Sequence, residues 1–335
     1  MSTTIENNSL MSALISSFPT DLSKAISIAE GSTFKINSTA FNNVLICGMG
    51  GSGIGGKLVA SWVQKEIKIP ILFCQDYSIP NFVNEKTLII ASSNSGNTEE
   101  TLIATEKGRI KGAHIVGICS GGKLKNYCEK YDFNFIQVPG GAPPRTTLAY
   151  SLVQLLHILN SFELIKNNHF IDIQKSQTIL IKRAEEIKSR AKELAVFLED
   201  KHLMIYSAAI DEPIAIRARQ QFNENSKLLV GHHVIPEMNH NELLGWTGGN
   251  KKYGVLIIDS GKLNEKNYRR LNFSIDFIKN KSPYILTLKS FGESKIERSL
   301  YIIHLIDWAS YFYAVNNDID SVEINVIEEL KEILD

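Results

Sequence analysis

Two short loops rich in glycine and hydroxyl residues each lie between an apolar run and a segment with helical periodicity. The first extends from Gly48 to Gly53 and the second from Ser92 to Thr98. A helix N-terminus presents unpaired backbone N–H groups with partial positive charge, and glycines let an anion approach that backbone closely. Hydroxyl groups add donors that rotate to suit the oxygens. The two loops together therefore predict a pocket for a phosphorylated ligand.

The first loop also matches the fingerprint of dinucleotide-binding folds. Gly48, Gly50 and Gly53 have the GxGxxG spacing, and Asp76 stands at the end of the next apolar run. A nicotinamide-dependent oxidoreductase is therefore an alternative. Ser52 and the hydroxyls of the second loop favour a phosphate pocket, because a dinucleotide would not need a second loop of this kind.

The second loop has a simpler interpretation as a well-capped helix. Asn97 begins the next helical segment, and Glu100 follows three residues later as in a capping box. Capping would explain these two residues. It would not explain why Ser93, Ser95 and Thr98 are packed together directly after a buried strand, so we favour anion binding.

Arg145 stands at a third candidate position. It follows Pro143 and Pro144, which stiffen the chain on that side. A guanidinium on a rigid loop can hold phosphate or sugar oxygens through its planar fork of donors. The default for an isolated arginine is a solvated surface residue. This one follows a predicted strand, and open α/β sheets bind ligands at the carboxyl ends of their strands, so we favour a functional role.

The second half of the chain supplies candidates for acid–base chemistry. Glu224 lies among amides on a predicted helix and could abstract a moderately acidic C–H proton; taken alone it is a surface helix residue. His240, in a polar loop, could transfer a proton to a ring oxygen. His232 and His233 are better interpreted as a turn. Lys331 lies on an amphipathic C-terminal segment, where a lysine on the wet face is the default.

The first half alternates short apolar runs with longer helical segments. This pattern predicts βαβ units with five parallel strands and helices on both faces of the sheet, because parallel strands need helix-sized crossovers. Strands are expected at 44–47, 70–73, 88–91, 115–118 and 133–138, and helices near 53–66, 97–110, 123–130 and 146–164.

A polar interruption at 165–172 predicts a boundary between two domains, 1–168 and 169–335. The length of 335 residues agrees with two domains of ordinary size. In the second half, strands are expected at 202–206, 253–258 and 284–288, and helices near 212–227, 264–279, 295–315 and 321–333.

Composition excludes several classes of function. Lys plus Arg and Asp plus Glu each total 36, so the chain lacks the positive field that binds nucleic acid. No signal segment, no run of eighteen apolar residues and no HExxH motif or His/Cys cluster is present, which predicts a cytoplasmic protein with no membrane association and no metal. The scattered cysteines Cys47, Cys74 and Cys119 are expected to be small buried hydrophobes.

The ordered set of motifs resembles a known family. Gly48 to Gly53, Ser93 to Thr98, Pro144-Arg145, Asn223 to Asn225 and Asn239 to Glu242 follow one another as in the bifunctional phosphoglucose/phosphomannose isomerases of the sugar isomerase (SIS) superfamily. The resemblance covers nearly the whole chain. It implies two SIS domains, each a five-stranded parallel sheet in a flavodoxin-like three-layer sandwich. It also implies a homodimer with shared active sites, a hexose 6-phosphate substrate and no cofactor.

The resemblance also implies a role for each matching residue. Glu224 becomes the base that moves a proton between C1 and C2 through a cis-enediol. Arg145 steadies the intermediate, His240 from the partner subunit assists ring opening, and Lys331 contacts the ring oxygen. The phosphate-binding group comprises Gly51, Ser52, Ser93, Ser95 and Thr98.

One stretch departs from the family pattern. Family members often carry a threonine-proline pair before the last helix, whereas this chain has Asp320-Ser321-Val322-Glu323. A small hydroxyl there is thought to help the pocket accept mannose 6-phosphate, and Ser321 is the candidate substitute. A sugar-phosphate sensor is a further alternative, because SIS modules also occur in regulators. No helix-turn-helix segment is evident.

Overall fold

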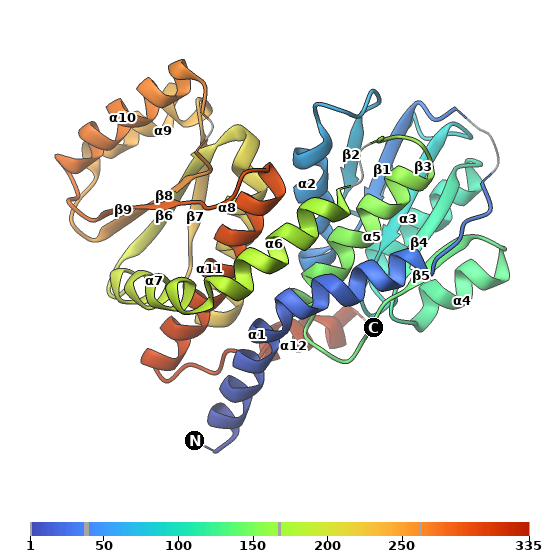
Figure 1. Cartoon of the computed structure of the whole chain (residues 1–335), viewed down its shortest axis with the longest axis horizontal. Helices are drawn as coiled ribbons and strands as arrows, with labels where there is room; N and C mark the ends of the chain where they lie inside the picture. The colour runs from blue at the N-terminus through green and yellow to red at the C-terminus, as the bar shows by residue number, and fades with distance from the viewer. Residues whose placement is uncertain (1, 37–39, 167–168, 262, 335) are drawn as a thin grey trace. The chain divides into compact units, whose positions relative to one another are not determined.

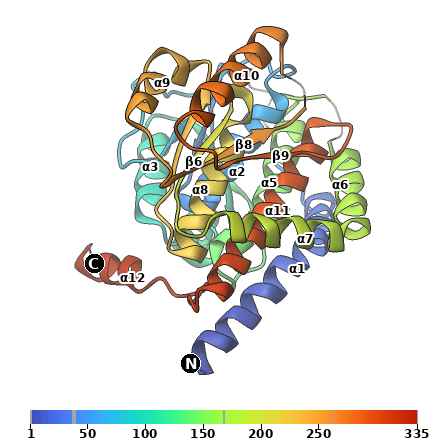
Figure 2. The ribbon, with the colours of Figure 1, turned by 90° about the vertical axis from the view of Figure 1, so that its left-hand side faces the viewer.

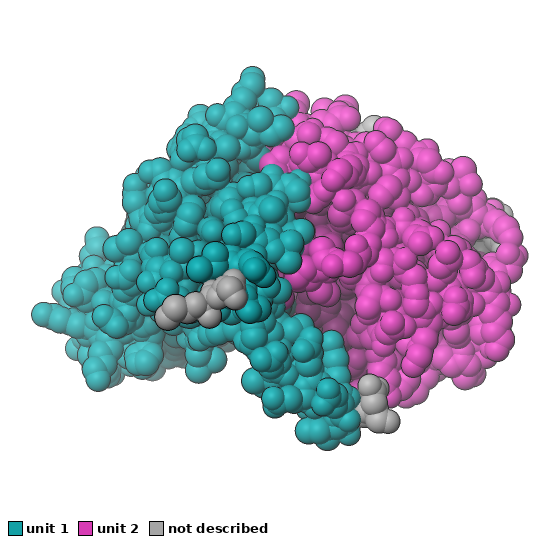
Figure 3. All heavy atoms as spheres, turned by 90° about the horizontal axis from the view of Figure 1, so that it is seen from below, with its two compact units in different colours: residues 1–17, 178–335 teal, residues 18–177 magenta. Residues whose placement is uncertain are grey.

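A computed structural model describes residues 2–36, 40–166, 169–261 and 263–334. Contacts between residues divide the chain into two compact units (Figure 3). The first, here called the amino-terminal unit, comprises Phe18–Gln177, and the second, the carboxy-terminal unit, comprises Met1–Ser17 and Thr178–Asp335. Helix α1 (Ser2–Glu30) and helix α6 (Phe170–Lys182) each contribute residues to both units.

The sheet of the amino-terminal unit is parallel throughout and has the order β2-β1-β3-β4-β5. Two interior strands, β1 and β3, are buried along their whole length, as expected for strands covered on both faces. All five strands predicted for this half are confirmed. Their bounds are β1 Asn43–Cys47, β2 Ile71–Cys74, β3 Thr87–Ser92, β4 His114–Cys119 and β5 Asn134–Gln137.

Helices cover both faces of this sheet (Figure 1). Helices α3 (Glu99–Ile110) and α4 (Gly122–Lys130) pack on the face formed by side chains such as Ile89 and Cys119. Helices α2 (Gly50–Val63) and α5 (Leu148–Ser161) pack together, with Gly56 of α2 against Ile46 on the opposite face. This half is therefore the predicted three-layer sandwich. Cys47, Cys74 and Cys119 are buried, as predicted, and none of them forms a disulfide.

The carboxy-terminal unit differs from the expected five-stranded sheet. The described residues form four parallel strands in the order β7-β6-β8-β9: β6 His202–Ala208, β7 Gly231–Ile235, β8 Tyr253–Asp259 and β9 Ile285–Lys289. After β9 the chain enters the buried helix α11 (Lys295–Asn316). The segment that follows is bonded to α1 through Asn7 and Asn8, so it is not available to pair with β9.

The prediction of a turn at His232 and His233 is wrong. Both residues lie in β7, the edge strand beside β6. An edge strand has one hydrogen-bonded neighbour and is only half-buried here, so its sequence lacks the continuous apolar run that marked the other strands.

Helices also cover this second sheet. Helix α10 (Glu265–Lys279) packs on the face that carries Tyr206 and Val255. Helix α11 packs against α7 (Ala184–Phe197) and α8 (Glu212–Ser226), and Figure 2 shows α7 and α11 in the turned view. The chain ends in α12 (Asn325–Leu334). Within the described ranges, no helix combines the length and the apolar character needed to cross a bilayer.

A buried ion pair connects α8 to α11. Arg217 donates to Asp307 Oδ1 at 3.1 Å, and Gln221 Nε2 donates to the same oxygen at 2.7 Å. Both charged side chains are nearly inaccessible. Burial raises the pKa of Asp307, while the Arg217 guanidinium opposes that shift. A buried pair adds little net stability, but removal of one partner leaves an uncompensated charge.

Replacement of Asp307 by asparagine should therefore destabilise the protein severely. Asp307→Asn keeps the shape but removes the charge opposite Arg217, and we expect the free energy of unfolding to fall by about 3 kcal/mol or more. Urea unfolding followed by circular dichroism measures the change. Asp276→Asn, on the exposed side of α10, is the control and should stay within about 0.5 kcal/mol of the wild type. Equal midpoints for the two variants would contradict the argument.

Candidate active site

The two glycine- and hydroxyl-rich loops meet at one edge of the amino-terminal sheet. Strands β1 and β3 are neighbours, but the chain leaves β1 toward β2 and leaves β3 toward β4. Open α/β sheets bind ligands at such a switch point, outside the carboxyl ends of the strands. The loops touch there, because the Asn94 N–H donates to Ser52 Oγ at 3.2 Å.

The start of α2 is well suited to an anion. Its N-cap residue, Met49, has extended backbone and provides no side-chain cap, and no acidic residue lies in the first turn. The backbone N–H groups at this end therefore remain available to an acceptor. Helix α3 differs, since Glu99 and Glu100 occupy its first turn. The helix dipole thus favours an anion at α2 more than at α3.

The hydroxyls of the second loop shape the loop itself. Ser93 Oγ and Thr98 Oγ1 are 2.8 Å apart, and Ser93 Oγ accepts a hydrogen bond from the Gly96 N–H at 3.1 Å. Ser95 Oγ accepts from the Asn97 N–H at 3.2 Å and is exposed. Because a hydroxyl that accepts a bond can still donate its proton, these groups remain possible donors to a ligand.

The capping-box interpretation of this loop is wrong. Helix α3 begins at Glu99 with Thr98 as its N-cap residue. Asn97 Oδ1 instead accepts a hydrogen bond from the Lys123 N–H at 3.0 Å, at the start of α4. Asn97 therefore connects two loops at the carboxyl edge of the sheet.

A third loop carries Arg145 to the same edge. Arg145 lies in the short helix η1 (Pro144–Thr146) and is only 2% exposed, so the solvated-surface alternative is wrong. Asn94 Nδ2 donates to Thr147 Oγ1 at 3.1 Å, and Thr147 donates to the Pro144 carbonyl at 2.9 Å. These bonds connect η1 to the second loop. The three loops surround a small hollow whose lining includes Gly51, Ser52, Ser92, Asn94, Pro144 and Thr147.

Asn94 and Thr147 are the residues that the sequence reasoning missed. Each was assigned to a loop or helix start with no role of its own. Their position was the feature that could have identified them, since both are polar residues near the carboxyl edge of the sheet. Asp76, the acidic residue of the dinucleotide alternative, instead accepts a hydrogen bond from the Tyr77 N–H at 2.6 Å in its own turn.

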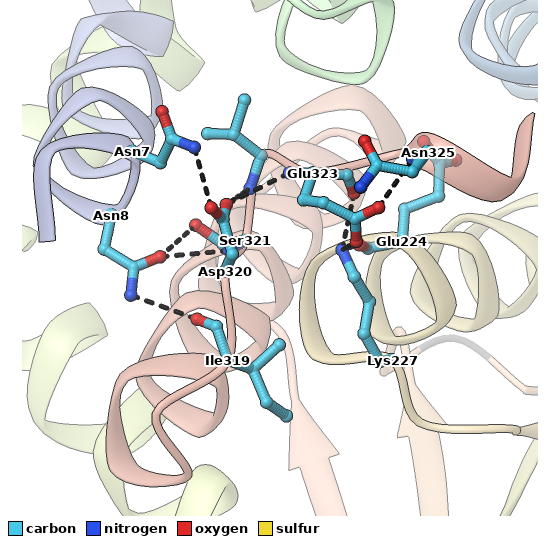
Figure 4. Close-up of polar contacts among 10 residues, drawn as sticks. Asn7, Asn8, Glu224, Lys227, Ile319, Asp320, Ser321, Glu323 and Asn325 are labelled. Carbon is cyan, nitrogen blue, oxygen red and sulfur yellow. Dashed lines mark hydrogen bonds and ion pairs between the residues drawn. The ribbon is translucent and has the colours of Figure 1, made fainter. Parts of the chain in front are cut away.

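Glu224 lies in the last turn of α8, where its neighbours are firmly held. Asn225 is fully buried and donates to Ser310 Oγ at 3.0 Å, while Asn223 Oδ1 accepts from the Val230 N–H at 3.3 Å. Lys227, which ends the helix in a left-handed conformation, donates to the carbonyl oxygens of Glu224 and Glu323, each at 2.7 Å (Figure 4). The half-buried Glu224 thus belongs to a fixed helix end.

The segment before α12 is tied down on its other side. Ser321 is fully buried, and its hydroxyl donates to Asn8 Oδ1 at 2.7 Å (Figure 4). Asp320 accepts a hydrogen bond from Asn7 Nδ2 at 2.7 Å. The segment therefore bridges α1 and the end of α8. Lys331 follows on α12 and is exposed.

The loop that carries His240 has one exposed imidazole among anchored neighbours. Asn239 Nδ2 donates to Ser274 Oγ at 2.7 Å on α10. Asn241 Oδ1 caps the short helix α9 (Glu242–Gly245) by accepting from the Glu242 N–H, and Glu242 accepts from the Tyr206 hydroxyl. The described residues provide no hydrogen-bond partner for the His240 ring, so it remains available to a ligand.

The residues predicted to bind phosphate therefore lie in the amino-terminal unit. Ser52, Ser93, Thr98 and Arg145 lie on the three converging loops, with Ser95 on the exposed side of the second. The predicted proton-transfer residues Glu224 and His240 belong to the carboxy-terminal unit, as does Lys331, which is predicted to contact the ring oxygen.

The fold is that of the SIS proteins. Residues 187–334 match the family described as bacterial phospho-glucose isomerase C-terminal SIS domain. Among solved structures, the C-terminal domain of glucosamine-fructose-6-phosphate aminotransferase from Francisella tularensis superposes with a TM-score of 0.74. That match covers 94% of this chain and 98% of the other at 16% identity, which establishes the likeness of fold alone.

Sequence comparison identifies the family. A bifunctional phosphoglucose/phosphomannose isomerase from Caldicellulosiruptor bescii is 34% identical over 329 residues, covering 94% of this chain and 96% of that protein. The chain belongs to the family of bifunctional phosphoglucose/phosphomannose isomerases. A D-glucosamine-6-phosphate 4-epimerase from Sulfolobus acidocaldarius is 29% identical over 293 residues, covering 85% of this chain and 87% of that protein. Related sequences thus include a protein named for another reaction.

Gly51 provides a test of the convergence of the loops. A Cβ atom at this position would lie 2.8 Å from the Pro144 carbonyl oxygen, so Gly51→Ala must displace η1. We expect Gly51→Ala to lower the free energy of unfolding by about 1–3 kcal/mol through overpacking.

The matched control is Gly245→Ala, because Gly245 has helical backbone and no atom near the position of a new Cβ. That change should be neutral or stabilising by about 0.5–1 kcal/mol. Chemical denaturation of both variants makes the comparison. An undisturbed Gly51→Ala protein would show that the first and third loops are not in close contact.

Proposed function

We propose that this protein interconverts glucose 6-phosphate and mannose 6-phosphate with fructose 6-phosphate. The observation that carries the proposal is the meeting of three loops at the carboxyl ends of β1 and β3. There the uncapped start of α2 with Ser52 meets the loop that carries Ser93 and the loop that carries the buried Arg145. Membership of the isomerase family supports this choice of reaction.

In this proposal the three loops that converge at the carboxyl ends of β1 and β3 hold the phosphate of the sugar. Backbone N–H groups at the start of α2 and the hydroxyls of Ser52, Ser93, Ser95 and Thr98 donate to the phosphate oxygens. Gly51 keeps the backbone accessible, and Arg145 steadies the developing charge on the intermediate. Anchoring a group remote from the reacting carbons fixes their position and can supply several kcal/mol toward the transition state.

Glu224 acts as the base in the chemical step. Its carboxylate removes the proton from C2 of the open-chain aldose while O1 takes up a proton, which gives a cis-enediol. It then returns a proton to C1 while O2 loses its proton, which forms the ketose. Before this step His240 transfers a proton that opens the sugar ring, and Lys331 contacts the ring oxygen. The enediol is planar at C2, so glucose and mannose configurations lead to the same intermediate.

We assign Ser321 no contact with mannose 6-phosphate. The Ser321 hydroxyl is buried and donates to Asn8, so it is engaged within its own unit. This segment replaces the threonine-proline pair often found in the family. The phosphomannose activity therefore depends on how the pocket accepts both C2 configurations.

The proposal divides the work between two domains and two subunits. Domain 1–168 binds the phosphate, and domain 169–335 carries the base and the last helix. In a homodimer, His240 of one copy would serve the active site of the other. Light scattering after size-exclusion chromatography tests this directly, and a monomer at all working concentrations would place His240 in the site of its own chain.

Replacement of Glu224 by glutamine should abolish turnover while it preserves substrate binding. We expect kcat to fall by roughly 10²–10⁴-fold in Glu224→Gln, because one positioned base contributes an effect of that size. A coupled assay follows fructose 6-phosphate formed from each aldose phosphate, and calorimetry measures binding. Glu212→Gln, at the other end of the same helix, is the matched control and should behave as the wild type.

The outcomes separate the alternatives. Full turnover in Glu224→Gln would remove Glu224 from the role of base. A wild-type protein that binds the sugar phosphates without turnover would be a sensor. Formation of a product epimeric at C4 would identify the epimerase reaction instead.

Isotope transfer tests the enediol. With glucose 6-phosphate in ²H₂O, we expect deuterium at C1 of the fructose 6-phosphate that forms, because the carboxyl group that has taken the C2 proton exchanges it with solvent before it returns one. Proton NMR of the product measures the incorporation. The rate should be unchanged by chelator. Absence of solvent-derived deuterium at C1 of the product, together with chelator sensitivity, would favour a hydride shift at a metal site.

A further inference from the structure

The hydroxyl of Tyr206 on β6 bonds to Glu242, which follows closely after His240. We propose that Tyr206 and Glu242 are positioning residues that hold His240 where it meets the sugar ring. This inference rests on the proposed function, because it gives His240 a role in the reaction. Neither Tyr206 nor Glu242 needs to touch the substrate.

The connection consists of three side chains in a directed chain of hydrogen bonds. Trp246 Nε1 donates to the Tyr206 hydroxyl oxygen at 2.8 Å, and the Tyr206 hydroxyl donates to Glu242 Oε1. Tyr206 comes from β6, whereas Glu242 and Trp246 come from the short helices that directly follow His240. The bridge therefore ties these helices to the most central part of the sheet.

The protonation state of the Tyr206 hydroxyl follows from its surroundings. Tyr206 is 1% exposed, and burial together with the Glu242 carboxylate raises its pKa well above the ordinary value. The phenol therefore stays protonated and donates to the carboxylate. Hydrogen bonds in such a chain polarise one another, so the bridge is stiffer than separate bonds would be.

Packing holds Trp246, which is buried and stacks edge-on against Tyr253, but no residue of α9 is buried. A hollow of about 300 Å³, open to solvent, lies beside these residues, and its lining includes Met204, Tyr206, Glu242, Trp246 and Tyr253. Since α9 makes little close-packed contact of its own, the bond from Tyr206 to Glu242 fixes its distance from the sheet. On the other side, the fully buried Met238 and the Asn239–Ser274 bond anchor the loop.

This arrangement predicts a specific effect of removing one hydroxyl. Met238 and Asn239 still hold the loop in Tyr206→Phe, so the protein should fold. The helix after His240 loses its tie to β6, and the imidazole should sample a wider range of positions. Tyr253→Phe is the matched control, because Tyr253 lines the same hollow and its hydroxyl has no partner among the described residues.

A double-mutant cycle separates positioning from general support. We expect Tyr206→Phe to lower kcat for glucose 6-phosphate by about 10-fold in the wild-type background, equivalent to about 1.4 kcal/mol, and to have little further effect in the His240→Ala background. A loss of equal size in both backgrounds would overturn the proposal, since it would show that Tyr206 does not act through His240. Tyr253→Phe should leave kcat unchanged in both.

A second measurement does not depend on activity. In protein labelled with ¹⁵N-histidine, the signal absent from His240→Ala identifies the His240 ring. We expect this signal to shift or broaden in Tyr206→Phe and in Glu242→Gln, and to stay unchanged in Tyr253→Phe. An unmoved His240 signal in both bridge variants would overturn the proposal even if the isomerase activity is confirmed. If the wild type lacks the activity, a moved signal still establishes the positioning while the proposed function fails.

Discussion

The candidate phosphate site depends on the close approach of two backbone segments. The first turn of α2 meets the Pro144 carbonyl at Gly51, where even a methyl group would be 2.8 Å from that oxygen. This contact brings the start of a helix without a side-chain cap next to a loop that carries a buried arginine. Backbone donors are fixed by the helix and need no reorganisation, so a glycine at this position serves the electrostatics as well as the packing.

The two units solve the problem of positioning in different ways. In the amino-terminal unit, apolar strands buried on both faces hold the loops, and the polar groups are confined to one edge of the sheet. In the carboxy-terminal unit, polar side chains are themselves structural. Arg217 meets Asp307, Asn225 meets Ser310, and Tyr206 meets Glu242. Each such bond has a preferred direction and length, so it fixes the end of a helix more narrowly than apolar contact would.

This difference explains what the sequence could and could not predict. All five strands of the first half were located correctly, because each overlaps a run rich in apolar residues, including the partly exposed edge strands β2 and β5. Strand β7 is an edge strand with two histidines, and it was mistaken for a turn. The hydroxyl-rich loops were correctly placed between a strand and a helix, because composition and position in a βαβ unit are local properties. The partners of Asn97, Asn94 and Tyr206 are distant in sequence, and no local pattern identifies them.

The arrangement around the proposed base follows from the chemistry of proton transfer. A base that serves two neighbouring carbons must move little while the substrate changes hybridisation, so the base needs a stiff support. Glu224 has this support from the last turn of α8, where Asn223, Asn225 and Lys227 bond to three separate segments. The bond from Lys227 to Glu323 also couples that helix end to the chain that leads into α12. This bond fixes the point at which the chain toward α12 passes the end of α8, beside the proposed base.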